Sequence, residues 1–403
     1  MADRITELRI EGLRTIDKLV LPLDGLTVLI GENGSGKSSI IEACQVLSSV
    51  ASSSFLNELH TAHGGPARLL RDNTSEMTLG LTVVSDTGAP TLDYDLRFLR
   101  ADYGLVVASE ALWQRDDTRR IQIFSRPEGA RTAWLGREAP APEWLATDTP
   151  PREPLVGSSG PWSTHQASQR MRAALSSIDV HRPFDVVSLW EARQAQRLSP
   201  TRQAVVLQRA DRLEFLARNL ANAFYTLAHD FGEAHWRETI DYVKLGLGYD
   251  IERIVTPADA GGGAISIEIE LQGRRRRPAA SLSDGQLAYL AFVALLRLEA
   301  PCSLLAFDEP DLHLHPGLLA RVMDFFGQIS RRHPVLLATH SDTALDCLED
   351  PARSTRVCEL EMPERRTRVR ALDPEALAKW LTDYRGVGHI RGDGNLPLVL
   401  KDE

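Results

Sequence analysis

Residues 26–39 read Leu-Thr-Val-Leu-Ile-Gly-Glu-Asn-Gly-Ser-Gly-Lys-Ser-Ser, and this stretch decides the fold. The apolar run 26–30 predicts a buried strand, and the segment from Ser38 to about Leu47 predicts a helix. A glycine-rich loop between a strand and a helix that opens with Gly-Lys-Ser is typical of a phosphate-binding loop. Glycines let consecutive backbone N–H groups face a polyphosphate, and the helix N-terminus adds unsatisfied donors. The stretch therefore predicts a nucleotide site.

Each residue type in the loop has an expected task. Lys37 is expected to reach the β- and γ-phosphates, and the Ser38 hydroxyl to hold Mg²⁺. A chance glycine turn before a helix is the alternative, and motifs farther along the chain decide against it. The other residues expected to contact the phosphates are Gly31, Asn33, Gly34, Ser35, Gly36 and Ser39.

Composition excludes several protein classes. The 403 residues are 43% hydrophobic, which is enough for a sizeable core in two or three structural units. A net charge of −9 argues against a generally basic nucleic-acid binder, so any DNA contact needs a local patch. The four cysteines have no paired spacing and are expected to be reduced. The sequence has no apolar leader and no membrane-spanning run, so we expect a cytoplasmic protein with no membrane partner.

The rest of the chain divides into segments of different pattern. Short strands are predicted at 5–10 and 17–22, and period-two alternation over 76–126 predicts an antiparallel meander. Residues 136–165 carry six prolines and are expected to form a loop. We favour a surface connection there over a docking loop for a partner. Residues 166–249 are Arg-rich with helical spacing, without the long heptad array of a coiled coil.

Four consecutive arginines lie at 274–277, after an alternating strand at 264–271 and a turn at Gln272 and Gly273. Such clusters are usually solvated turns. A contact with phosphate or with the DNA backbone is the alternative, because the cluster comes just before a second phosphate-facing motif.

Three further motifs carry polar residues at the ends of predicted elements. Ser283 is a good N-cap for an apolar helix, and Gly285 would let a phosphate approach closely. The buried strand 303–308 ends in two acids: Asp308 suits ordering Mg²⁺, and Glu309 suits polarising the attacking water. The strand 335–339 leads into Thr-His-Ser at 339–341. The carboxyl ends of buried parallel strands are where ligands bind in open α/β sheets.

In this order the four motifs resemble those of ABC-type ATPases, and within them the soluble RecF-, SMC- and OLD-like (overcoming lysogenization defect) proteins. The best resemblance is to stand-alone bacterial AAA-family ATPases related to OLD, carried by residues 10–16, 308–316 and 373–381. It implies an α/β fold: an ABC-type P-loop ATPase head with a mixed sheet, an antiparallel β subdomain and a helical insertion. We expect the ATPase lobe at 1–135 and 251–403, the Pro-rich loop at 136–165 and the insertion at 166–250.

The resemblance also implies roles for residues. Residues 31–39 would bind ATP with Mg²⁺, which Asp308 orders. Glu309 would be the general base, Lys37 a catalytic phosphate contact, and His340 the sensor of the γ-phosphate. Ser283, Gly285 and Gln286 would contact the nucleotide of the other subunit. Residues 311–315 would form the loop between the two sites; their Asp-Leu-His-Leu-His sequence could alternatively suggest a metal pair.

One residue of the family pattern is missing. These ATPases use a glutamine after the first helix to couple Mg²⁺ to the outer subdomain, and none occurs between Gln45 and Gln114. Asp72 or Asn73 could substitute.

The resemblance further implies a homodimer that closes around two ATP molecules. The segment after His340 offers a strand pair and a helix, so we expect no nuclease domain here. We therefore expect a separately encoded effector, such as a nuclease, and a role in anti-phage defence or DNA maintenance. The alternatives are an ATP-gated scaffold with little turnover and a RecF-like DNA-repair ATPase; DNA is a candidate partner in each.

Overall fold

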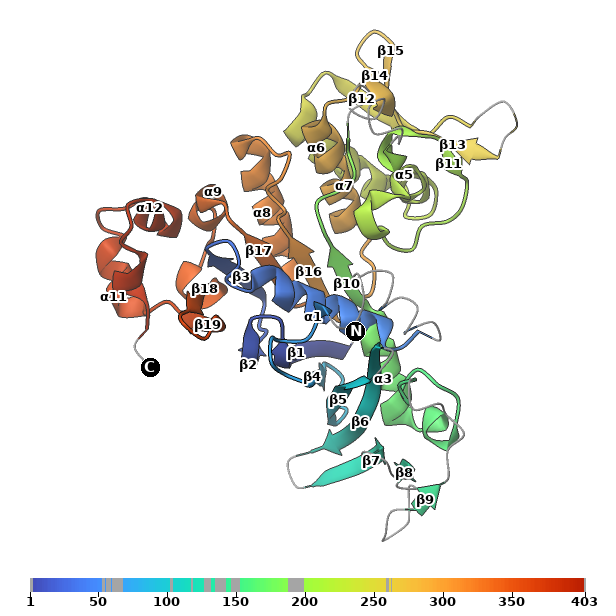
Figure 1. Ribbon diagram of the computed structural model, residues 1–403. Coiled ribbons are helices and arrows are strands. Elements are labelled where there is room, and N and C mark those ends of the chain that lie inside the picture. The colour runs from blue at the N-terminus through green and yellow to red at the C-terminus, as the bar shows by residue number, and fades with distance from the viewer. Residues whose placement is uncertain are drawn as a thin grey trace.

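The computed structural model describes residues 3–52, 55, 59, 68–101, 104–116, 119–126, 132–134, 143–145, 153–187, 199–258, 261 and 263–401. A six-stranded sheet occupies the centre (Figure 1). An eight-stranded sheet extends below it in the view, and a helical part with two small sheets lies at the upper right. The C-terminal helices lie to the left.

The central sheet has the strand order β10-β16-β17-β3-β18-β19. Neighbouring strands are parallel, except that β19 runs antiparallel to β18. Its strands are β10 (Ile178–His181), β16 (Leu304–Asp308), β17 (Val335–Thr339), β3 (Leu26–Gly31), β18 (Thr355–Glu361) and β19 (Arg366–Ala371). The predicted strands at 26–30, 303–308 and 335–339 are thus confirmed and lie side by side.

The central strands are apolar along their whole length because both faces of the sheet are covered. Val28 and Ile30 of β3 face one core, which α7 (Asp284–Arg297) and α8 (Pro316–Ser330) complete. Leu29 faces the other core, shared with α1 (Lys37–Ser49). Runs buried on both faces are typical of parallel sheets.

The eight-stranded sheet is antiparallel throughout, in the order β2-β1-β4-β5-β6-β7-β8-β9. Strand β1 supplies Ile5, Leu8 and Ile10 to the core that α1 shares. The predicted meander is confirmed. The strands are β1 (Asp3–Leu13), β2 (Ile16–Pro22), β4 (Glu76–Ser85), β5 (Thr91–Ala101), β6 (Gly104–Arg115), β7 (Arg120–Arg126), β8 (Thr132–Trp134) and β9 (Glu143–Leu145).

The helical part packs on α7 through α5 (Leu220–His229) and α6 (Glu233–Leu247). A Cβ on Gly246 of α6 would lie 2.1 Å from the ring of Tyr289, so only glycine permits this close approach. Two small sheets join this part: β11 (Val205–Val206) with β13 (Ala264–Ile265), and β12 (Ile251–Val255) with β14 (Glu268–Leu271) and β15 (Arg275–Pro278). The remaining helices are α3 (Gln166–Ser176), α9 (Asp342–Asp346), α10 (Pro351–Ser354), α11 (Pro374–Trp380) and α12 (Val387–Gly392).

Three predictions of secondary structure from the sequence were wrong. The segment 166–249 is not helical throughout, since β10 and β11 lie within it, and β10 belongs to the central sheet. The segment 136–165 contains β9 and a short 3-10 helix at Pro161–Thr164; its other residues up to 152 lie outside the described residues. The strand 264–271 breaks into β13 and β14, which pair with different partners. Four-residue strands carry too little periodicity to be distinguished in sequence.

In the described part of the chain, no helix is both long and apolar enough to cross a bilayer. All four cysteines are free thiols, as expected.

A buried carboxyl group ties the segment after residue 152 to the outer sheet. Glu110 of β6 accepts hydrogen bonds from the Tyr94 hydroxyl at 2.8 Å and from the backbone N–H groups of Leu155 and Val156. Arg126 lies 3.6 Å from the same carboxyl group. Burial raises the pKa of Glu110, and the Arg126 charge opposes that shift.

We expect Glu110→Ala to destabilise the protein by about 3–5 kcal/mol, because it leaves a phenol and two N–H groups without their acceptor and removes the carboxylate that pairs with the buried Arg126. Chemical denaturation measures the loss. Glu76→Ala, on a half-exposed ion pair with Arg97, is the matched control and should cost at most about 0.5 kcal/mol. Equal losses of stability in the two variants would contradict the role described for Glu110.

Candidate functional site

The phosphate loop lies between β3 and α1, and two close contacts fix its shape. A Cβ on Gly31 would lie 2.0 Å from the Cys358 carbonyl oxygen of the neighbouring strand. Gly36 has φ +99°, and a Cβ there would lie 2.2 Å from the Thr367 hydroxyl. Both positions therefore need glycine. The loop brings the predicted phosphate contacts together at the amino end of α1.

Lys37 points back into its own loop. Its ammonium group donates to the carbonyl oxygens of Gly31 and Glu32, at 2.8 and 2.9 Å. The residue is 4% exposed, and burial lowers its pKa. The ammonium is thus held beside the loop, where a phosphate oxygen could take the place of a carbonyl.

Ser38 and Asp308 meet although they are far apart in sequence. The Ser38 hydroxyl donates to Asp308 Oδ1 at 3.2 Å, joining the start of α1 to the end of β16. Burial raises the pKa of Asp308, while the Ser38 bond and the charge of Arg182 lower it. A hydroxyl and a carboxylate beside a phosphate loop fit Mg²⁺, which keeps waters and takes few protein ligands together with phosphates. The predicted metal residues are therefore adjacent.

Glu309 and His340 form a pair at the same edge of the sheet. Glu309 has φ +53°, and its N–H donates to the Ala338 carbonyl oxygen at 2.7 Å. Its Oε1 lies 3.2 Å from His340 Nε2. Burial, with repulsion from Asp311 and Asp308, raises the pKa of Glu309 to about 7. Burial and the charges of Lys37 and Arg391 lower the pKa of His340.

The loop 311–315 is organised by hydrogen bonds within the chain. The Thr339 hydroxyl donates to Asp311, and His315 caps α8 by accepting from the Gly317 N–H at 3.2 Å. No group of three or more potential ligands gathers anywhere among the described side chains, so the alternative of a metal pair gains no support. Leu312 is 49% exposed at the tip of this loop.

The predicted N-cap at Ser283 is confirmed. Its hydroxyl accepts from the Gln286 N–H at 3.3 Å, and its own N–H donates to Gln286 Oε1 at 3.0 Å. Gly285 approaches the 311–315 loop: a Cβ there would lie 2.7 Å from the His313 carbonyl oxygen. In this subunit Gly285 thus makes room for a backbone, and Ser283 faces solvent.

A cavity of about 680 Å³ opens over the phosphate loop, a size suited to a nucleotide. Asp72 and Asn73 line it, whereas Ser283, Gly285 and Gln286 do not. Its lining, as far as the structure describes it, is Arg14, Thr15, Asn33, Gly34, Gly36, Lys37, Ser38, Ser39, Arg68, Leu70, Arg71, Asp72, Asn73, His340, Pro363, Glu364 and Arg365.

Sequence reasoning missed two arginines near the site. Arg182 follows β10, whose last residue pairs in register with Phe307, so it lies beside Asp308. Arg391 of α12 donates to the His340 carbonyl oxygen at 3.1 Å and to Asp342 Oδ1 at 2.6 Å. Neither belongs to a motif. Arg182 could have been found only by recognising β10 as a strand of the central sheet. The position of Arg391 depends on the packing of α12 on α9.

Comparisons with known proteins agree with this geometry. The family model described as "AAA domain, putative AbiEii toxin, Type IV TA system" matches residues 26–346. A solved Smc head bound to the C-winged helix domain of ScpA is 16% identical, with 93% of this chain and 99% of that chain covered and a TM-score of 0.55. An Smc head with an extended coiled coil, bound to the C-terminal domain of ScpA and derived from Pyrococcus furiosus, is 15% identical, with 94% and 99% covered and a TM-score of 0.54. No curated protein matches this sequence.

These likenesses confirm the expected fold, an ABC-type ATPase head. The domain boundaries, the narrower resemblance to OLD-like and RecF-like proteins, and the role of each site residue stay predictions.

The carboxyl group of Glu309 gives a pH-dependent stability in the nucleotide-free protein. Its pKa rises from an ordinary 4.5 to about 7 on folding, so the folded state binds more protons than the unfolded state between these values. Stability is therefore lost as pH rises from 4.5 through 7. Glu309→Gln lacks this loss. We expect the difference in the free energy of unfolding between this variant and the unmodified chain to shift in favour of the variant by about 1 kcal/mol from pH 5 to pH 8.

Thermal unfolding at the two pH values measures this difference. Glu252→Gln, at an exposed position on β12, is the control and should show no change between them. An advantage of Glu309→Gln that is the same at both pH values would contradict the environment described for this carboxyl group.

Proposed function

This chain belongs to the AAA-domain family whose model matches residues 26–346, and on that premise we propose that it binds and hydrolyses ATP with Mg²⁺. The observation that carries the proposal is the convergence of β3, β16 and β17. Near their carboxyl ends, Lys37, Ser38 and His340 line one cavity, and Asp308 and Glu309 contact two of these lining residues, Ser38 and His340.

The chain's own residues supply binding and proton transfer. The loop N–H groups and Lys37 would hold the phosphates, and Ser38 with Asp308 would hold Mg²⁺, which neutralises charge on the phosphates when bound. Glu309 would orient the attacking water and accept its proton. A pKa near 7 leaves a substantial carboxylate fraction at neutral pH. His340, 3.2 Å from Glu309, would hold that side chain in place.

We further propose that two copies close head to tail around two ATP molecules. Two observations support this. The cap residues Ser283 and Gln286 are absent from the described lining of the phosphate-loop cavity and bond each other, whereas Asp308 and Glu309 contact the lining residues Ser38 and His340. Ser283 is exposed, and Leu312 nearby presents half of its apolar surface to solvent. A site completed by a second copy makes association depend on nucleotide by linkage.

The cellular role we propose is gating of a separate effector in anti-phage defence or DNA maintenance. Outside the ATP site, no candidate metal centre occurs among the described residues, which favours an effector on another chain. The family description names a toxin and a Type IV TA system, and a solved relative in fold carries a bound ScpA domain. The ScpA complex is a precedent for a head of this fold that works with a partner.

Direct DNA binding has less support. Within the cluster 274–277, Arg276 pairs with Glu268 and Glu270, and Arg253 also pairs with Glu270. These carboxylates neutralise Arg276, but Arg274, Arg275 and Arg277 are exposed, so the weaker support for DNA rests on the net charge of −9.

Variants of two site residues separate binding from turnover. We expect Glu309→Gln to bind ATP and accumulate as a dimer, because phosphate contacts remain and the base is lost. Lys37→Ala should stay monomeric at the same ATP concentration, because it loses the charge that holds the phosphates. Mass photometry with and without Mg-ATP reads both outcomes. A Glu309→Gln protein that is monomeric at all concentrations would contradict the proposed dimer.

The effector proposal predicts a partner that depends on nucleotide state. Glu309→Gln, purified with ATP from the native host by affinity, should retain a protein that Lys37→Ala does not retain, because only the first closes. Mass spectrometry and nucleic-acid staining of matched samples identify what is held. Recovery of the ATPase alone from both variants would count against an effector, and recovery of DNA without protein would favour the repair alternative.

A further inference from the structure

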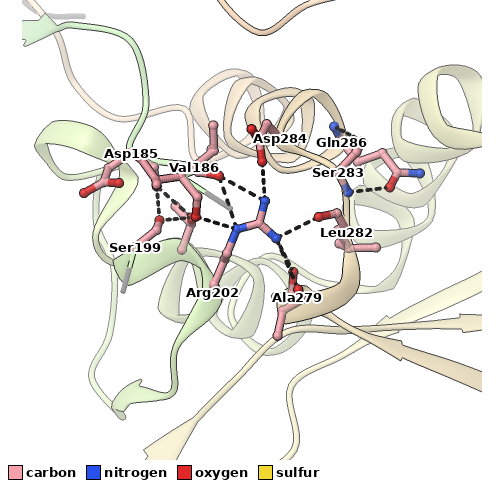
Figure 2. A network of polar contacts seen from close by, with 12 residues as sticks. Asp185, Val186, Ser199, Arg202, Ala279, Leu282, Ser283, Asp284 and Gln286 are labelled. Carbon is pink, nitrogen blue, oxygen red and sulfur yellow. Dashed lines mark hydrogen bonds and ion pairs between the residues drawn. The ribbon is translucent and has the colours of Figure 1, made fainter. Parts of the chain in front are cut away.

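A buried arginine outside every motif holds the segment that precedes α7. Arg202 ends the short 3-10 helix Pro200–Arg202, and its side chain is 2% exposed. Figure 2 shows its guanidinium between two stretches of chain, 185–187 on one side and 279–284 on the other.

Residues 279–286, which we call the signature segment, lie on one side of the guanidinium, which binds both the loop 279–282 and the start of α7. One terminal nitrogen donates to the Leu282 carbonyl oxygen at 2.7 Å and to those of Ala279 and Ala280 at 3.3 Å. The other forms an ion pair with Asp284, the first residue of α7, at 2.5 Å. The residues on both sides of Ser283 are thus fixed, while Ser283 itself stays exposed.

On the opposite side, Arg202 is itself held in place. Its Nε donates to the Val187 carbonyl oxygen at 2.9 Å, and Nη2 donates to that of Val186 at 3.0 Å. The Thr201 hydroxyl donates to the Asp185 carbonyl oxygen at 2.8 Å. The guanidinium is therefore a fixed fork and not a mobile surface group.

Guanidinium chemistry matters for this arrangement. Its planar fork offers five N–H donors in fixed directions, whereas a lysine ammonium is a point charge with three rotating donors. A lysine at position 202 could satisfy Asp284 or the carbonyl oxygens of 279–282, but not all of them together. Carbonyl groups left without donors would favour other conformations of the loop.

We propose that Arg202 is a positioning residue, which presents Ser283 and Gln286 to the ATP bound by the partner copy. This inference rests on the proposed dimer. None of the Arg202 contacts lines the phosphate-loop cavity of the same subunit. Loss of the fork should therefore impair the site on the partner copy and leave nucleotide binding by its own loop intact.

The test is made in the Glu309→Gln background, where dimers accumulate. With Arg202→Lys added, we expect the monomer's affinity for a fluorescent ATP analogue to stay within about twofold, and ATP-dependent dimerisation to weaken about tenfold, as loss of a charged hydrogen bond would produce. Arg253→Lys, at a partly exposed ion pair, is the matched control and should change neither. Asp284→Asn, which keeps the carbonyl contacts, should weaken dimerisation less than Arg202→Lys and serves if that variant does not fold.

Mixed subunits separate a role in the partner's site from a general defect. Arg202→Lys and Lys37→Ala chains, each otherwise unmodified, are mixed with Mg-ATP. The pair contains one site with an intact loop and an intact signature segment, so it should associate more than either variant alone. When one chain carries both substitutions, its mixed pair with an unmodified chain contains no intact site, so this mixed pair should form less than the first one.

The outcomes distinguish the two proposals. If Glu309→Gln alone does not dimerise, the proposed dimer fails. If it dimerises, and Arg202→Lys or Asp284→Asn changes dimerisation no more than Arg253→Lys does, the role of Arg202 is overturned. A loss of ATP-analogue binding equal to the loss of dimerisation would also overturn it, since that indicates a fold defect.

Discussion

The parallel pairing of β3 with β17 and β18 is the constraint on which the rest of the structure depends. Because β16 pairs with β17 in the same direction, three strands end at one edge and deliver Lys37, Asp308 and His340 there. The apolar runs of these strands are covered on both faces, by α1 on one side and by α7 and α8 on the other. Burial fixes the strand register, and the register fixes which polar residues meet.

Burial disfavours the charged forms of the polar groups at this edge of the sheet, and bound nucleotide would relieve that cost. Two carboxyl groups lie close together with raised pKa values, and the pKa of the buried Lys37 is lowered. A bound cation would favour the ionised form of both carboxyl groups, and phosphate would favour the ammonium. The interaction of these groups with bound nucleotide and Mg²⁺ would thus contribute to binding, which makes the loop and the ends of β16 and β17 sensitive to nucleotide.

Much of this could be predicted from the sequence because its signals are local. The phosphate loop, the cap at Ser283 and the meander each depend on residues close together in the chain. Arg202 and Arg391 could not be found in this way, because each binds backbone oxygens that any sequence would provide and a carboxylate 82 or 49 residues away, respectively. The strand β10 was missed for a related reason. Its four residues become a strand through pairing with β16, more than a hundred residues later.

The central claim is that one subunit holds half of each ATP site. The most direct measurement is a crystal or cryo-electron microscopy structure of Glu309→Gln with ATP and Mg²⁺. The account predicts a dimer in which Ser283 of one copy contacts the γ-phosphate held by Lys37 of the other. ATP-bound copies whose signature segments remain in solvent, or a dimer joined through another face, would contradict it.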